Sequence, residues 1–183
     1  MSRACVILAP GFEEIEAVTI IDVLRRAGID TAVLGLGGKG PVQGSHGIKI
    51  DAERSLSEAE RDSWDIVILP GGMPGATNLR DDPRVIGLIR RQHESGKRIG
   101  AICAAPIALG AAGVLEGRKA TSYPGFEKEL RGATVSTERV VKDGNVLTSR
   151  GPGTALEFAL AVVADLEGEA AADKLRSGML VAP

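Results

Sequence analysis

Short, continuous apolar runs that alternate with helical patterns constrain this fold more than any other feature. Four of the runs predict buried strands, at residues 4–9 (ACVILA), 30–36 (DTAVLGL), 64–72 (WDIVILPGG) and 97–102 (KRIGAI). A strand with one wet face alternates polar and apolar residues, whereas an unbroken apolar run indicates burial on both faces. The pattern therefore predicts an α/β fold, a doubly wound and mostly parallel sheet with helices on both faces.

The segments between these runs carry helix and turn signals. Helices are predicted at residues 13 to about 27, 81–96, 105–113, 153–168 and about 169–177, and Gly28, Gly96 and Gly113 mark helix ends. The Asp-Gly pair within residues 139–149 predicts a β-hairpin. Weaker signals predict a strand or hairpin near 48–50, one helical turn within 55–62, a short strand at 119–123, and one or two helical turns at 126–132.

Composition limits the classes of function. A chain of 183 residues is expected to form a single domain, residues 1–183, and an aromatic content of 3% requires an aliphatic core. The net charge of −2 without a basic run argues against nucleic acid and membrane partners. No signal peptide or membrane span is recognisable, and the cysteine usage fits best with a reducing cytoplasm, where a lone thiol stays available for chemistry. Two cysteines without a Cys/His cluster predict neither a metal site nor a disulfide.

Four segments are expected to meet at one edge of the sheet. They follow predicted strands, and they comprise residues 10–14 (PGFEE), 70–72 (PGG), Cys103, and 149–154 (SRGPGT). In doubly wound folds, ligands bind outside the carboxyl ends of the strands. Topology therefore predicts the functional site at this edge.

Cys103 lies where a predicted strand turns into a predicted helix. A nucleophile elbow needs small residues two before and two after the nucleophile, and Ala101 and Ala105 occupy those positions. Amides at the start of the helix favour a thiolate, and the amides of Gly71 and Gly72 are candidates to stabilise an oxyanion. The alternative is a small buried cysteine without chemistry.

Glu16 is the candidate partner of the thiol. His46 and His93 lie in a glycine-rich loop and at a polar helix end, so a Cys-His pair is not evident. The helix around Glu16 is apolar almost all round from residue 15 to 24, which predicts that Glu16 is partly buried. A buried carboxyl tends to keep its proton and can then donate to sulfur or shuttle a proton. The alternative is an ordinary exposed glutamate.

Four motifs together resemble one family. The segments LAPGFEEIEAVTIIDVLRRAG, VILPGGMPGATNL, AICAAP and LTSRGPGTALEFALAVV resemble the PfpI superfamily, and the likeness extends over about residues 4–180. Within it, the chain is most similar to the bacterial branch of the parkinsonism-associated protein deglycase family. The resemblance implies a flavodoxin-like fold and a single PfpI-type domain of the class I glutamine amidotransferase-like kind.

The resemblance also implies roles for particular residues. Cys103 is the reactive thiol with Glu16 as its carboxyl partner, no cofactor is required, and the first helix contributes to a homodimer. Further residues are implied around the oxyanion and the pocket: Gly72, Ala104, Ser149, Gly151, and Arg25 or Arg26. Three positions depart from relatives, since Ala104 and Tyr123 stand where some have histidine, and His46 where several have arginine.

Three functions are compatible with these residues. In the first, the Cys103 thiolate adds to a 2-oxoaldehyde such as methylglyoxal or acts on its adducts, and Glu16 is the acid/base, as in a glyoxalase or deglycase. In the second, the protein is a redox-sensing stress-response protein or chaperone whose Cys103 oxidises to sulfinate. The third, a cysteine peptidase or amidase, is weakened by the missing histidine.

Overall fold

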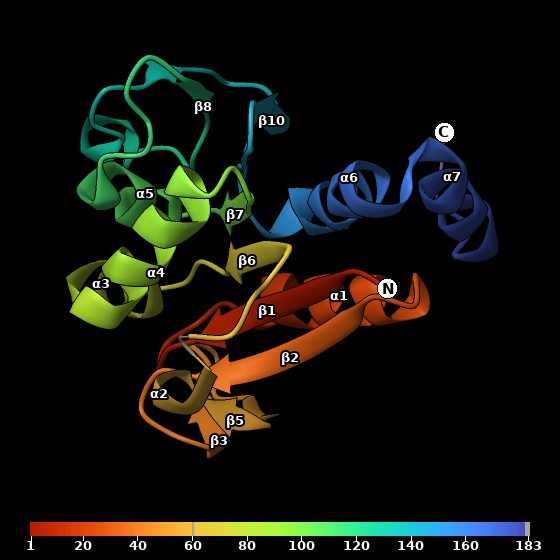
Figure 1. Ribbon diagram of the computed structural model, residues 1–183, viewed down its shortest axis with the longest axis horizontal. Coiled ribbons are helices and arrows are strands. Elements are labelled where there is room, and N and C mark those ends of the chain that lie inside the picture. Colours follow the sequence, from red (N-terminus) through yellow and green to blue (C-terminus); the bar gives the residue numbers. More distant parts are fainter. Residues whose placement is uncertain (60, 182–183) are drawn as a thin grey trace.

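The computed structural model describes residues 1–59 and 61–181 and shows a seven-stranded sheet between two layers of helices (Figure 1). The strand order is β10-β11-β7-β6-β1-β2-β5. Every neighbouring pair is parallel except β10 and β11. The strands are β1 (Arg3–Leu8), β2 (Asp30–Gly35), β5 (Arg54–Ser55), β6 (Ile66–Leu69), β7 (Arg98–Ile102), β10 (Val140–Asp143) and β11 (Val146–Ser149).

Strand β1 shows why the apolar runs build this sheet. Ala4, Val6 and Leu8 point to one face, where they pack with residues of α1 (Glu14–Arg26) and α6 (Ala155–Glu167). Cys5 and Ile7 point to the other face and pack with residues of α4 (Pro83–Glu94) and α5 (Pro106–Ala112). Both faces of the strand are therefore buried, which confirms the predicted flavodoxin-like, doubly wound arrangement.

The helices gather as two groups (Figure 1). Helices α1, α6 and the C-terminal α7 (Glu169–Gly178) lie on one side, and α3 (Gly75–Asp81), α4 and α5 lie on the other. The side chain of Asp82 accepts from the amide of Arg84 and begins α4, the helix that the sequence predicts at residues 81–96. Within the described residues, no helix combines the length and apolarity that a membrane crossing requires.

Short elements differ most from the sequence expectation. Helix α3 was not predicted, because its sequence GATNLRD has neither a side-chain cap nor an apolar stripe. The expected turn at residues 126–132 is a 3₁₀-helix, η1 (Glu127–Glu129). A second 3₁₀-helix, η2, precedes α6. Helix α2 forms part of the helical turn predicted within residues 55–62. Residue 60 of that range lies outside the described residues. The remaining elements are α2 (Leu56–Ala59), β8 (Lys119–Ala120), β9 (Thr134–Val135) and η2 (Pro152–Thr154).

The glycine-rich segment after β2 forms a separate antiparallel hairpin. Its strands are β3 (Gly40–Gln43) and β4 (Lys49–Ala52), so the strand predicted near residues 48–50 begins at Lys49. The loop between them, residues 44–48, is called the hairpin loop below. It hydrogen-bonds to the segment that joins β1 to α1. These hydrogen bonds place the hairpin next to the segment that leads into the first turn of α1, where Glu16 lies.

Candidate active site

Cys103 occupies a strained corner between β7 and α5. Its φ angle is 63°, in the left-handed region that residues with a side chain rarely adopt. Ala101 and Ala105 on either side are fully buried, so larger residues would have no room. The corner is fixed by two backbone hydrogen bonds, from the Cys103 amide to the Ser149 carbonyl at 2.9 Å and from the Tyr123 amide to the Cys103 carbonyl at 2.8 Å.

Glu16 reaches this corner from the first turn of α1. Its amide donates to the carboxylate of the N-cap residue Glu13 at 2.7 Å. Its Oε2 accepts from the amide of Gly71 at 2.8 Å. A Cβ placed on Gly71 would lie 2.5 Å from the Cys103 Cβ and 2.9 Å from Glu16 Oε2. Cys103 and Glu16 therefore flank Gly71 at the carboxyl edge of the sheet.

Burial controls the proton affinity of Glu16. The side chain has no exposed surface, and burial raises the pKa of Glu16 to about 7, against the hydrogen bond from Gly71 that lowers it. Oε2 accepts from the Gly71 amide, whereas Oε1 is buried without a backbone donor, and a side-chain hydrogen bond with Cys103 also lowers the pKa of Glu16. The proton of a neutral Glu16 therefore belongs on Oε1.

The thiol of Cys103 is less acidic than its position at the start of α5 predicts. Burial raises the pKa of Cys103 to about 12, and the Glu16 carboxylate adds to the increase. The amides of Gly72 and Ala104 act in the opposite direction, which agrees with their predicted direction toward the sulfur. The amides favour the thiolate, as expected, but burial outweighs their effect and leaves the pKa of Cys103 raised. Protonation of Glu16 removes the neighbouring charge and makes the thiolate easier to form.

Three further predicted residues lie around the corner. A Cβ on Gly151 would lie 3.1 Å from the Tyr123 ring, so these two residues contact each other. Tyr123 is about half exposed, and its backbone is tied to Cys103 by the hydrogen bond described above. Ser149 supports the corner through its carbonyl, while its buried hydroxyl donates to the Arg139 carbonyl and pairs with Thr154 at 2.7 Å. Ser149 is therefore a supporting residue, with its hydroxyl committed elsewhere.

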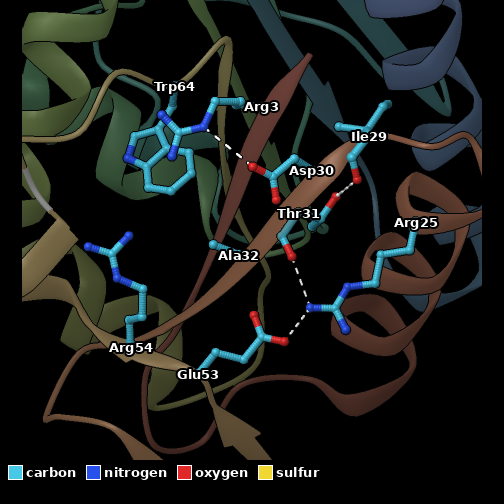
Figure 2. Close-up of a pocket in the computed structure, with 9 residues that line it drawn as sticks. All are labelled: Arg3, Arg25, Ile29, Asp30, Thr31, Ala32, Glu53, Arg54 and Trp64. Carbon is cyan, nitrogen blue, oxygen red and sulfur yellow. Dashed lines mark hydrogen bonds and ion pairs between the residues drawn. The ribbon is translucent and has the colours of Figure 1, made fainter. Parts of the chain in front are cut away.

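Arg25 and Arg26 do not reach Cys103 within this chain, contrary to the expectation. They lie in the last turn of α1, about 14 Å along the helix axis from Glu16. Arg25 donates to Glu53 at 2.5 Å and to the Thr31 carbonyl (Figure 2). It lines a cavity of about 470 Å³ at the amino ends of the strands, the edge opposite Cys103. Arg26 pairs with Asp22 at 2.5 Å.

His46 lies in the hairpin loop and is held by a glutamate that sequence reasoning overlooked. Its Nδ1 is 2.9 Å from Glu14 Oε2. Among the described residues, Glu13, Glu14 and His46 form one group whose possible metal-ligating atoms lie within 4.8 Å of one another. The oxygens of Glu14 already accept hydrogen bonds from the hairpin loop. The sequence signal was the group of three acidic residues within residues 13–16, of which only Glu16 was singled out as a candidate.

These features define a flavodoxin-like α/β protein with a nucleophile-elbow cysteine at the carboxyl edge of its sheet. The sequence matches the DJ-1/PfpI family over residues 2–165, and the chain belongs to that family. It is 44% identical to the Parkinson disease protein 7 homolog of Danio rerio, over 98% of this chain and 97% of the relative. This confirms the family resemblance seen in the motifs.

Two further relatives bear on function. The glutathione-independent glyoxalase DJR-1.2 of Caenorhabditis elegans is 38% identical over 90% of this chain and 89% of its own length. The solved structure of Toxoplasma gondii DJ-1 in an oxidized form superposes with a TM-score of 0.96, at 36% identity and full coverage of both chains. The family thus includes a glyoxalase and a member observed oxidized.

Proposed function

We propose that this protein is a cysteine-dependent glyoxalase or deglycase that acts on 2-oxoaldehydes or their adducts without an added cofactor. The observation that carries the proposal is the buried Glu16 carboxyl, which interacts with the Cys103 thiol, beside two amides that act on the same sulfur. The glyoxalase among the relatives supports the same chemistry. Only 8% of the Cys103 surface is exposed, and a small aldehyde is a substrate that can reach a thiol with so little accessible surface.

The proposed reaction conserves all atoms of the substrate and adds one water. Cys103 gives its proton to Glu16, and the thiolate forms a C–S bond to the aldehyde carbon of methylglyoxal. The amides of Gly72 and Ala104 stabilise the oxyanion, which then takes up a proton. That proton comes from Glu16, whose restored carboxylate then removes the hydrogen of the same carbon as a proton. Glu16 delivers this proton to the neighbouring ketone carbon, and the ketone oxygen takes up the proton that the new hydroxyl gives up, so that a thioester forms. Water breaks the C–S bond of the resulting thioester, which releases lactate and the thiol.

Glu16 must serve as both acid and base in this scheme. Ala104 follows the cysteine directly and Tyr123 is tied to it through its backbone, and neither position supplies an imidazole. A group with a pKa near 7 exchanges protons efficiently in both directions at neutral pH. On a hemithioacetal or hemiaminal adduct the same steps would be observed as deglycase activity.

The test is lactate formation from methylglyoxal in buffer that contains no glutathione. We expect turnover by the wild-type protein, none by Cys103→Ser, and wild-type turnover by Cys5→Ser. Cys5 is buried within β1 and packs against α4 and α5, in a different core cluster from Cys103. Turnover that survives in Cys103→Ser would refute the proposed nucleophile.

A second candidate function is redox sensing. The Toxoplasma gondii relative was solved in an oxidized form. In this chain, the amides near the Cys103 sulfur and a protonated Glu16 would donate hydrogen bonds to a sulfinate. A stress-response or chaperone role would then depend on oxidation rather than turnover. A peptidase or amidase has less support, because the site provides no histidine next to Cys103.

We also propose that the protein is a cytoplasmic homodimer with one PfpI-type domain. Ile15 and Val18, three residues apart on α1, are 59% and 49% exposed. Residues at this spacing share one helix face, and exposed apolar faces of this kind mark interfaces. Ile21, three residues beyond Val18, is buried against the chain's own core. Two free cysteines fit a reducing compartment.

A further inference from the structure

The carboxylate of Glu14 binds the hairpin loop, although it is next to the residues of the site. It is 4% exposed, and it accepts from the His46 amide at 2.6 Å, the Ile48 amide at 3.3 Å and the Ser45 hydroxyl at 3.3 Å. His46 Nδ1 lies 2.9 Å away, and since a carboxylate only accepts, that nitrogen is the donor. One buried carboxylate thus satisfies four donors of the hairpin loop.

The hairpin also binds the segment that leads into α1. The Gly11 amide donates to the Gln43 carbonyl at 2.8 Å, and the Ser45 amide donates to the Phe12 carbonyl at 2.8 Å. This segment ends at Glu13, whose amide donates to the Gly71 carbonyl at 2.9 Å. The hairpin therefore holds the segment on one side, and Gly71 holds it on the other.

We propose that Glu14 is a positioning residue that clamps the hairpin loop onto the first turn of α1 and thereby sets the placement of Glu16 against Cys103. Glu14 lies between Glu13, which receives the Glu16 amide, and Glu16 itself. Without the clamp, the first turn would lose its side-chain contacts to the hairpin loop, and only the two backbone hydrogen bonds would remain on that side. The carboxyl of Glu16 would then move from its fixed place at Gly71.

The clamp depends on the charge of Glu14 and on close packing. Hydrogen bonds to an ionised acceptor are roughly twice as strong as neutral ones. The bonds from His46 and Ile48 keep the pKa of Glu14 low despite its burial, so the carboxylate stays charged at neutral pH. A Cβ on Gly44 would lie 2.3 Å from Glu14 Oε1, so the loop fits tightly over the carboxylate.

The test reads the thiol directly, so its result does not depend on whether the protein is a glyoxalase. Alkylation of Cys103 by iodoacetamide is measured from pH 5 to 10 in wild type and Glu14→Gln, which keeps the shape but loses the charge. The ionisable groups that act on this pair are Glu16, facing Cys103, and Glu13, facing Glu16. A displaced Glu16 no longer raises the pKa of the thiol, so Glu14→Gln should react roughly tenfold faster at pH 8.

Glu53→Gln is the matched control. Glu53 also accepts from a backbone amide, that of Val33 at 3.0 Å, and from the cation of Arg25, but at the opposite end of α1 (Figure 2). The alkylation profile of Glu53→Gln should match that of the wild-type protein. If Glu14→Gln also matches wild type, the inference is overturned.

A substitution at an exposed position gives a second test that does not disturb the buried core. His46→Ala removes the ring donor to Glu14 from a side chain that is 72% exposed. It should shift the profile in the same direction by a smaller amount, and the shift should disappear in a Glu14→Gln background if both act through one clamp. An unshifted profile in a folded His46→Ala protein, or fully additive shifts, would contradict the clamp.

Discussion

The amide of Gly71 donates to Glu16 Oε2 at 2.8 Å. The same residue packs so closely on the other side that any Cβ it carried would lie 2.5 Å from the Cys103 Cβ. A glycine is therefore required between the thiol and the carboxyl. Its backbone holds the carboxyl, and its missing side chain lets the two reactive groups approach.

Gly71→Ala should damage the site more than the fold. We expect a loss of about 1–3 kcal/mol in the free energy of unfolding, typical of overpacking, and a fall in methylglyoxal turnover of roughly 10²-fold from displacement of Cys103 and Glu16. Urea unfolding and lactate assays measure the two effects. Gly37→Ala is the control, since a Cβ there would meet no atom within 4 Å. Equal activity in both variants would contradict the packing argument.

Glu16→Gln separates the enzyme from the redox sensor. Glutamine keeps the shape and a hydrogen-bond donor but cannot exchange a proton, so turnover should fall by roughly 10²–10⁴-fold. Sulfinate formation on Cys103 under mild peroxide should persist in part, because stabilising the oxide needs only a donor. Lactate assays and intact mass follow the two reactions. Wild-type turnover in Glu16→Gln, with Cys103→Ser inactive, would show that the assigned acid/base role is wrong.

The two cysteines should oxidise in a fixed order. Cys5 has no exposed surface and burial strongly raises its pKa, whereas Cys103 is 8% exposed and lies near two amides. Under mild peroxide, peptide mapping should place oxygen on Cys103 first. Preferential modification of Cys5 would contradict the elbow assignment.

Stability should fall as the pH rises through the range in which Glu16 ionises. The pKa of Glu16 is about 7 in the folded protein and ordinarily 4.5, so the folded state binds this proton more tightly than the unfolded chain does. The resulting stabilisation is complete below about pH 4.5 and is lost as the pH rises to about 7. It corresponds to roughly 3 kcal/mol. Urea unfolding at pH 5 and pH 8 should show this loss in wild type and not in Glu16→Gln.

The exposed face of α1 should hold two copies together. Light scattering at micromolar concentration should give twice the chain mass of 19.0 kDa. Val18→Asp should produce monomers, because it places a charge on the apolar face that contains Ile15. Asp51→Asn on β4, at an exposed position, should leave the mass unchanged. A monomeric wild type would rule out the dimer.

The sequence by itself determined the sheet and the corner. An unbroken apolar run such as that of β1 is buried on both faces, whatever the order of the strands in the sheet. The small side chains of Ala101 and Ala105 allow the sharp turn at Cys103. These features depend on side-chain size and polarity over a few neighbouring residues, which can be read directly from the chain.

Only the tertiary structure decided the surroundings of these groups. It assigned Arg25 to the amino edge of the sheet, turned the Ser149 hydroxyl away from Cys103, and placed Glu14 under the hairpin loop. It also showed that burial outweighs the amides at the thiol. Contacts and desolvation of this kind arise between segments tens of residues apart, so they depend on how the elements pack and have no signature in the local sequence.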